Sequence, residues 1–135
     1  MRRVLLLAAV VMICGSVSWA QDPVKVDSKH YKLVSENAQV RILRVHYGPK
    51  EKSVMHAHPD SVAVFLTDAH VKFTMPDGTS QEENGKAGDS RFAAAGKHNP
   101  ENLSDKPFDV IVIELKGKAA PPPPPPAKKA AKKTS

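Results

Sequence analysis

Two histidines separated by a single residue are the part of this sequence whose types and spacing could do chemistry. His56 and His58 flank Ala57 and are followed by Pro59. Residues two apart on a strand point to the same face, with Cα atoms about 6.5 Å apart. Two such imidazoles can bind one metal ion at nitrogen distances of about 2.1 Å. Histidines at this spacing also face solvent or bond to backbone carbonyls, so the pair alone leaves both roles open.

A third histidine lies in a second block about 40 residues later, Gly88 to Asn102. Taken together, the two blocks resemble the two sequence motifs of the cupin superfamily: a glycine followed by HxH, and later two glycines, a histidine and an asparagine. The matching residues are Gly48, His56, His58, Gly88, Gly96, His98 and Asn102. The resemblance covers roughly residues 31–115.

The resemblance implies an all-β fold, the double-stranded β-helix or small jelly-roll barrel, with a metal ion inside it. It maps His56, His58 and His98 onto the family's three histidine ligands. The sequence departs from the family pattern at Val62, four residues after His58, where cupins usually carry a glutamate ligand. The expected site therefore resembles the three-histidine iron sites of cupin thiol and diketone dioxygenases, and Fe(II), Mn(II), Ni(II) and Zn(II) all suit imidazole ligands.

The turn before His98 also departs from the family. Ala94 replaces the turn proline, and only Lys97 separates Gly96 from His98. The turn is one residue shorter than usual, and a slip of one residue in a strand reverses the face that a side chain occupies. The register of His98 is therefore a point for the structure to settle.

The remaining polar candidates have simpler interpretations. We expect the single histidines His30, His46 and His70 to be half-exposed or hydrogen-bonded rather than ligands. Asp60 is close enough to His58 to replace the missing acid, but its Pro-Asp-Ser context favours a turn. We expect Asn102 to order a turn, and Lys97 to be solvated or to attract an anion. The candidates with these simpler interpretations are His30, His46, His70, Asp60, Asn102 and Lys97.

The residues around these motifs form short β-rich runs separated by turn residues, a pattern typical of a sandwich or barrel. Strands are predicted at 31–35, 40–47, 53–58, 62–67, 70–75, 79–83, 90–94, 97–103 and 108–115. Pro76-Asp77-Gly78 predicts a tight hairpin, with glycine supplying a positive φ.

We expect a small barrel without a long cavity, its interior filled by the four phenylalanines and the run 110–113. The nearly continuous apolar run 108–115 predicts burial on both faces, for example by a second copy in a homodimer. The four phenylalanines are Phe65, Phe73, Phe92 and Phe108.

The first 20 residues have the pattern of an export signal. Arg2 and Arg3 precede the apolar run 4–13, and small residues precede a predicted cleavage after Ala20. A transmembrane anchor is the alternative, but the run is shorter than the roughly 20 residues that a bilayer needs. Cleavage would place the protein in the periplasm or outside the cell. It would also remove Cys14, the only cysteine, so that residues 21–117 form a domain without a disulfide.

The net charge of +6 is unevenly distributed. Residues 21–117 carry 13 basic residues and all 14 acids, whereas residues 118–135 carry five lysines and no acid. Six consecutive prolines, 121–126, predict a disordered tail with a polyproline rod that holds the lysines about 20 Å from the domain. The tail is either a solvated spacer or a contact for an anionic envelope surface. Nucleic acid is not expected as the partner of an exported chain.

Two functions fit these observations. The first is a metal-dependent enzyme, a dioxygenase-like oxygenase or an isomerase, which acts on a small enolisable or phenolic molecule. The second is a non-catalytic envelope module that binds a metal or a small ligand and is tethered by its cationic tail. The sequence offers no evident general base, because its acids lie in turns such as Glu82-Glu83.

Overall fold

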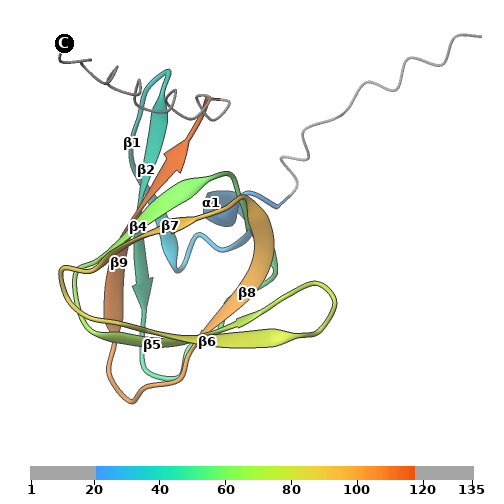
Figure 1. The fold of residues 1–135 in the computed structure, drawn as a ribbon, viewed down its shortest axis with the longest axis vertical. Helices are drawn as coiled ribbons and strands as arrows, with labels where there is room; N and C mark the ends of the chain where they lie inside the picture. Colours follow the sequence, from blue (N-terminus) through green and yellow to red (C-terminus); the bar gives the residue numbers. More distant parts are fainter. Residues whose placement is uncertain (1–20, 118–135) are drawn as a thin grey trace, which may run out of the picture.

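Two antiparallel sheets packed against each other form the part of the chain that the computed structural model describes, residues 21–117 (Figure 1). The predicted leader 1–20 and tail 118–135 lie outside the described residues. Along the described chain the elements are α1 (Pro23–Val26), β1 (Tyr31–Glu36), β2 (Val40–Tyr47), β3 (His56–His58), β4 (Ser61–Phe65), β5 (Ala69–Thr74), β6 (Ser80–Gly85), β7 (Ser90–Ala93), β8 (Gly96–Asn102) and β9 (Phe108–Leu115). Within this part, no helix is long and apolar enough to cross a membrane.

The chain alternates between the two sheets. One sheet has the strand order β1-β2-β9-β4-β7 and the other the order β3-β8-β5-β6. From β3 onward each connection either crosses to the facing sheet or, between β5 and β6, closes a hairpin. This is the strand path of a jelly-roll barrel, so the predicted architecture is confirmed.

Eight of the nine predicted strands match the observed ones to within two residues at each end. The exception is the predicted strand 53–58, of which only His56–His58 form β3. Short helix α1 was not predicted, although its sequence carries a start signal. Asp22 is its N-cap and accepts a hydrogen bond from the amide of Val24, and Pro23 occupies the first turn.

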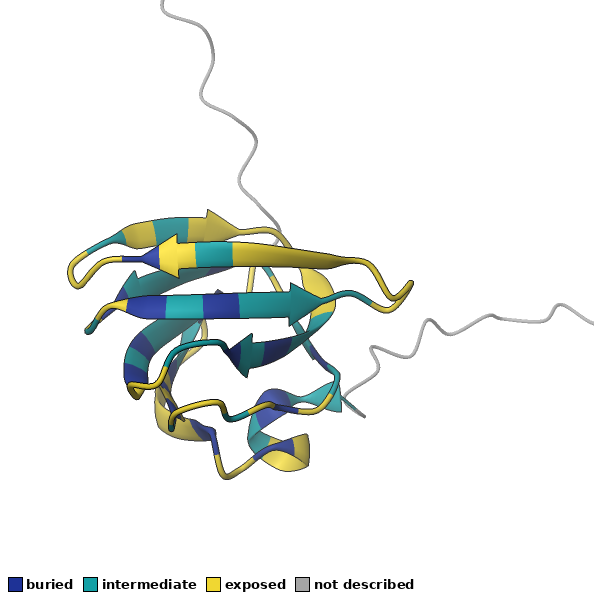
Figure 2. Ribbon diagram, turned by 90° about the horizontal axis from the view of Figure 1, so that it is seen from below, coloured by how far each residue is buried: buried dark blue, intermediate teal, exposed yellow. Residues whose placement is uncertain are grey.

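Buried residues alternate with exposed or half-buried ones along parts of β2, β5 and β9 (Figure 2). The core consists of Tyr31, Leu43, Val45, Tyr47, Phe65, Ala69, Val71, Phe108 and Val110. The prediction that Phe92 fills the interior is wrong, since this side chain is 64% exposed. Phe92 pairs with Val62 across β7 and β4, and alternation places both on the outer face of the sheet. Nothing in the short run 90–94 indicated which face Phe92 would take.

Strand β9 is the middle strand of the larger sheet, between β2 and β4. Its inward residues Phe108 and Val110 belong to the core, whereas Ile111 and Ile113 are half-buried on the outer face. The predicted burial on both faces is therefore nearly complete on the inner face, where Val112 is half-buried, and partial on the outer face. The homodimer stays a prediction.

The hairpin between β5 and β6 has the predicted turn. Gly78 adopts φ 85°, and the carboxylate of Asp77 accepts hydrogen bonds from the amide and hydroxyl of Thr79 at 2.9 and 2.7 Å. An Asp side chain that bonds two residues ahead and a glycine with positive φ are the two features of such turns.

A close contact between Phe65 and Gly85 yields a stability prediction. A Cβ at Gly85 would lie 2.4 Å from the ring of Phe65, which is 7% exposed. We expect Gly85→Ala to lower the free energy of unfolding by about 1–3 kcal/mol, because a buried aromatic ring must move. Gly117→Ala, where a Cβ meets nothing within 4 Å, is the control for urea unfolding. Equal stability of the two variants would mean that Phe65 shifts without cost.

Candidate metal centre

The three predicted ligands come together on two neighbouring strands. Strand β3 pairs with β8, and in this register His56 lies directly opposite His98 while His58 lies opposite Gly96. Directly opposed residues share a face, and so do residues two apart on one strand. The short turn before His98 therefore leaves this histidine facing His56 and His58. One ring nitrogen from each of the three lies within 4.8 Å of the other two.

The three rings form a compact, largely buried group. Their centroids are 5.0 Å apart for His56 and His58, 5.0 Å for His56 and His98, and 5.3 Å for His58 and His98. His56 is fully buried, the side chain of His58 is 8% exposed, and His98 is half-buried against Phe73 at 5.0 Å. The group is therefore open to solvent on the side of His98, the one half-buried member of the three.

Backbone geometry fixes the ring of His56. Its Nδ1 lies 2.8 Å from the carbonyl oxygen of Val54, which can only accept, so Nδ1 carries the proton. Its Nε2 is buried and has no hydrogen-bond partner. Buried polar atoms without partners are rare, and a ligand lone pair directed at an ion is one explanation.

A carboxylate fixes the ring of His58. The Nδ1–H of His58 donates to Glu114 Oε1 at 2.7 Å, which leaves Nε2 free to bind an ion. Glu114 is 2% exposed and also accepts a hydrogen bond from Arg41 at 3.1 Å. Carboxylate partners of this kind set the tautomer of ligand histidines and raise their basicity. Within residues 21–117, no hydrogen bond holds either ring nitrogen of His98.

This donor set fits a divalent ion held by imidazoles. The group of convergent ligand atoms found among the described residues contains three histidines and no carboxylate. Val62 does not line the cavity beside them, whereas its neighbours Ser61 and Ala63 do. The structure thus brings His56, His58 and His98 together with no acid at the position of the family's fourth ligand. Their ligation of a metal remains a prediction.

Burial keeps the imidazoles of His56 and His98 neutral, as metal ligands must be. Burial lowers the pKa of His56 to about 4, and repulsion from His58 adds to the effect. Burial also lowers the pKa of His98 to about 3, with further repulsion from His58 and His56. The rings of His56 and His98 therefore stay unprotonated, and able to bind an ion, well below neutral pH.

These lowered pKa values predict how stability changes with pH. The unfolded chain binds protons near the ordinary histidine pKa of 6.5, while folded His56 and His98 do so only near 4 and 3. The metal-free protein should keep its full stability above about pH 6.5 and lose it as the pH falls toward 4.5, by on the order of 1–2 kcal/mol for each histidine. Melting temperatures at pH 7.0, 5.5 and 4.5 measure this loss.

His98→Leu is the matched variant for that series, since it removes one of the two titrating groups and keeps an apolar side chain. We expect a smaller loss between pH 6.5 and 4.5 for this variant. The pKa values of Asp27 and Glu51 lie below their ordinary values, so these acids remain charged in this window. An unchanged pH dependence would contradict the assignment to His98.

A cavity of about 330 Å³ opens beside the histidines, inside the barrel. Its walls are mostly apolar and aromatic, with Tyr31, Tyr47, Phe73 and Phe108 among them. The hydroxyls of Tyr31 and Tyr47 bond to each other at 2.9 Å. Ser61 is 3% exposed, and its side chain has no partner among the described residues and faces this cavity. The cavity has room for a small molecule, so the prediction that side chains fill the interior holds only in part.

The other predicted candidates do not join the group. His46 and His70 lie in strands, half-exposed, and pair with Asp109 and Glu82. Asp60 accepts a hydrogen bond from the amide of Ala95 at 2.7 Å, a turn role. Asn102 bonds the carbonyls of Gly48 and Lys106 and accepts from the amide of Ser104. Lys97 is exposed at the cavity rim.

His30 is hydrogen-bonded, one of the two roles expected for it. It lies in the turn before β1 and is 4% exposed. Its Nδ1 lies 2.7 Å from Asp27 and its Nε2 lies 3.0 Å from Glu51. A histidine with a carboxylate at each nitrogen is hydrogen-bonded on both sides, as expected for a structural residue.

Glu114 is the residue of the site that sequence reasoning missed. The expectation that the acids cluster in turns away from the motifs is wrong for this residue. It is also wrong for Glu82 and Glu83, which lie in β6, where Glu83 lines the cavity. In β9 the inward positions are 108, 110, 112 and 114, so a charge at Glu114 occupies a core position. Buried carboxylates are uncommon without a partner. The sequence signal for this residue is the alternation of inward and outward positions along 108–115, which places Glu114 inward. The nearly continuous apolar run makes this alternation hard to recognise.

Comparisons with solved structures support this fold. A cupin domain from Bordetella pertussis Tohama I is 27% identical and superposes with a TM-score of 0.60, over 64% of this chain and 92% of that one. A double-stranded β-helix protein from Klebsiella pneumoniae is 20% identical, with a TM-score of 0.53 over 67% and 78% of the two chains. An RmlC-like cupin from Methanocaldococcus jannaschii is 13% identical, with a TM-score of 0.51 over 63% and 77%.

No protein-family model and no curated protein matches the sequence. The strand path and the similar structures together show that the chain has the cupin fold, a double-stranded β-helix. The resemblance predicted from the sequence motifs is thus confirmed for the fold. Three histidines that can hold a metal ion lie inside this fold.

Proposed function

We propose that this protein is a cupin that binds one divalent metal ion through His56, His58 and His98. The observation that supports this most directly is the orientation of the two HxH rings. Both engage their Nδ1 atoms in hydrogen bonds and leave Nε2 free, and the Nε2 of His56 is buried without a partner. A ring oriented in this way has its lone pair ready for an ion.

The ligand we propose is a small, mainly apolar molecule with an anionic oxygen, such as a phenolate or an enolate. A bound ion would supply a Lewis acid or an oxygen-binding centre, and three neutral imidazoles would leave its full charge to attract such a ligand. The aromatic walls would bury the apolar body, and the hydroxyl of Ser61 could donate to a polar group. The reaction would be that of a dioxygenase-like oxygenase or an isomerase.

Metal loading tests the proposal. Protein purified without a histidine tag should be reconstituted anaerobically with Fe(II), Mn(II), Ni(II) or Zn(II), passed through a desalting column and analysed for metal content. We expect about one ion per chain for at least one metal. Less than about 0.2 ion per chain with every metal would reject the site.

Oxygen uptake then tests catalysis. The reconstituted protein should be given diketones, thiols and phenols under air, with metal-free protein as the control. Uptake that requires both metal and substrate would support an oxygenase. Metal binding without turnover would favour the second candidate.

The second candidate is a non-catalytic metal- or ligand-binding module of the cell envelope. The absence of a carboxylate from the convergent group in residues 21–117 favours it. Glu83 is the acid that lines the cavity in this part of the chain, and it is paired with Arg91 rather than free to act as a general base. In this proposal an export signal at 1–20 delivers the protein to the periplasm or the medium, and the lysines of 118–135 attach it to an anionic surface.

Removal of the tail tests the attachment. We expect truncation after Gly117 to leave the melting temperature within about 2 °C of the full chain, because a solvated tail adds no core contact. Retention on vesicles with anionic lipid should fall, and neutral vesicles are the control. A fall in melting temperature of many degrees would show that the tail is part of the fold.

A further inference from the structure

Behind each of the two HxH histidines, on the side away from the cavity, lies a chain of buried polar groups that are hydrogen-bonded to one another. Each chain starts at the Nδ1 side of a ring and leads away from the candidate metal position. Both chains end in the same piece of the molecule, residues 22–30. This N-terminal segment contains α1 and its two caps and precedes β1.

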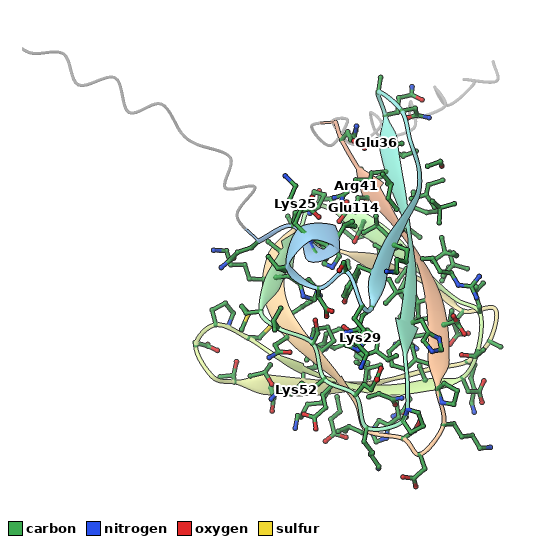
Figure 3. The ribbon with its side chains drawn as sticks, turned by 180° about the vertical axis from the view of Figure 1, so that it is seen from behind. Lys25, Lys29, Glu36, Arg41, Lys52 and Glu114 are labelled. Atoms are coloured by element: carbon green, nitrogen blue, oxygen red, sulfur yellow. The ribbon has the colours of Figure 1, made fainter. Side chains whose placement is uncertain are left out.

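The first chain leads from His58 to Asp22. His58 donates to Glu114, Arg41 donates to Glu114 at 3.1 Å, and Arg41 also donates to Asp22 at 2.8 Å. The side chains of Asp22 and Arg41 are only 8% and 15% exposed. Figure 3 shows Arg41 and Glu114 next to each other beside α1. Asp22 also caps α1, so the cap and the ion pair depend on one carboxylate.

The second chain leads from His56 to Asp27. The hydroxyl of Ser53 lies 3.4 Å from His56 Nδ1 and donates to Asp27. Asp27 is 9% exposed. Burial opposes its ionisation, but hydrogen bonds from Ser53 and His30 outweigh burial and lower its pKa. Asp27 is thus a buried carboxylate anion that is linked through the hydroxyl of Ser53 to His56, a candidate ligand.

The far end of the second chain is anchored to the barrel. His30 contacts both oxygens of Asp27 and one oxygen of Glu51, and its ring stacks on Tyr47 with centroids 4.2 Å apart. Its carbonyl accepts from the amide of His46 in β2. The segment therefore cannot shift without breaking buried hydrogen bonds.

Buried charges of this number are costly unless they hold a defined geometry. A core that needed stability alone would be served as well by apolar side chains at these positions. The polar chains instead constrain the two rings that the proposed function uses. They also place two carboxylates, Glu114 and Asp27, behind the proposed ligands, where they would not occupy coordination positions of a bound ion.

We infer that the segment 22–30 is a positioning element of the metal centre, which holds His58 through Asp22, Arg41 and Glu114 and holds His56 through Asp27 and Ser53. The inference rests on the proposed metal-binding function. In this arrangement Glu114 and Asp27 supply as second-sphere charges what cupins with a glutamate ligand supply by direct coordination. None of the five residues touches the ion.

Metal affinity in matched variants tests the inference. Glu114→Gln and Asp27→Asn keep size and remove charge, and we expect each to weaken Zn(II) or Co(II) binding by about 10–100-fold in chelator competition. Asp22→Asn should weaken binding less, and its effect should not add to that of Glu114→Gln, because both residues belong to the hydrogen-bonded series that starts at His58. Asp27→Asn and Glu114→Gln act on the two different series, so their losses of binding free energy should add.

Asp109→Asn is the control. It removes a carboxylate from the same strand as Glu114, but one that pairs with exposed Arg44 on the outer face. We expect unchanged metal affinity for this variant. The absorption spectrum of Co(II)-loaded protein should change in the Glu114 and Asp27 variants and not in Asp109→Asn.

A readout without metal separates this inference from the proposed function. In the metal-free protein, ¹⁵N shifts of the histidine rings should show a proton on Nδ1 of His56 and His58, and Glu114→Leu should mix the tautomers of His58. If the wild-type chain bound no metal, the proposed function would fail, and the tautomers would still report on the rings. If the variants lowered only the melting temperature and changed neither affinity nor tautomer, the segment would be structural and the inference overturned.

Discussion

His98→Ala is expected to lower metal affinity by roughly 100-fold or more, and His56→Ala should do the same. Removing one of three ligands leaves two imidazoles, which hold a divalent ion far less tightly, and a 100-fold loss corresponds to about 2.7 kcal/mol of binding free energy. Because His98 lies opposite His56 on β8 and has no hydrogen bond within residues 21–117, its loss leaves no buried donor or acceptor without its partner. Competition with a fluorescent chelator measures the affinity.

His70→Ala is the matched control for these variants. It removes a histidine from a strand of the same sheet, but one that is partly exposed and paired with Glu82. Its metal affinity should equal that of the wild-type protein. Equal losses in His70→Ala and His98→Ala would show that the ligand assignment is wrong.

Glu114→Leu is expected to destabilise the metal-free protein by about 3 kcal/mol. Removing one partner of a buried pair leaves the other charge without compensation, which typically costs 3–5 kcal/mol. Arg41 keeps its bond to Asp22, so the lower part of this range applies. Urea unfolding at pH 7 measures the change.

The double variant Glu114→Leu with Arg41→Met tests the reason for that loss. Arg41→Met alone leaves both Glu114 and Asp22 without their arginine, whereas the double variant leaves only Asp22 without it. The loss of stability in the double variant should therefore be smaller than the sum of the losses in the two single variants. If the double variant were less stable than the sum of the single variants, the ion pair would not be the source of the effect.

The order and nearly all of the strands of this fold could be predicted from the sequence, because each run of β-branched residues ends at turn residues such as Pro76-Asp77-Gly78. Errors arose where a run is too short to show alternation. The face of Phe92 in a four-residue strand is one example. The extent of β3 is another, since residues 53–55 are extended in sequence character but the continuous ladder with β8 covers only His56–His58. Before it, Lys52 forms only an isolated bridge with Glu101 of β8.

The three histidines of the site were predicted, and the polar groups behind them were not. The ligand pattern is local, since HxH on one strand and a single histidine on another can be recognised from spacing and family resemblance. The partners Glu114, Asp27 and Asp22 lie far from the HxH pair in sequence, and only the folded arrangement of β2, β3, β9 and the N-terminal segment brings them together. No single sequence window contains that information.

Strand β3 has three residues and lies at the edge of its sheet, where β8 is its only partner. Such a strand should open locally far more often than the middle strands, and its amides should exchange with solvent early. His56 and His58 would be joined to His98 through an ion, which would link positions about 40 residues apart and suppress this opening. Hydrogen exchange at β3 should therefore report metal occupancy before the global melting temperature changes.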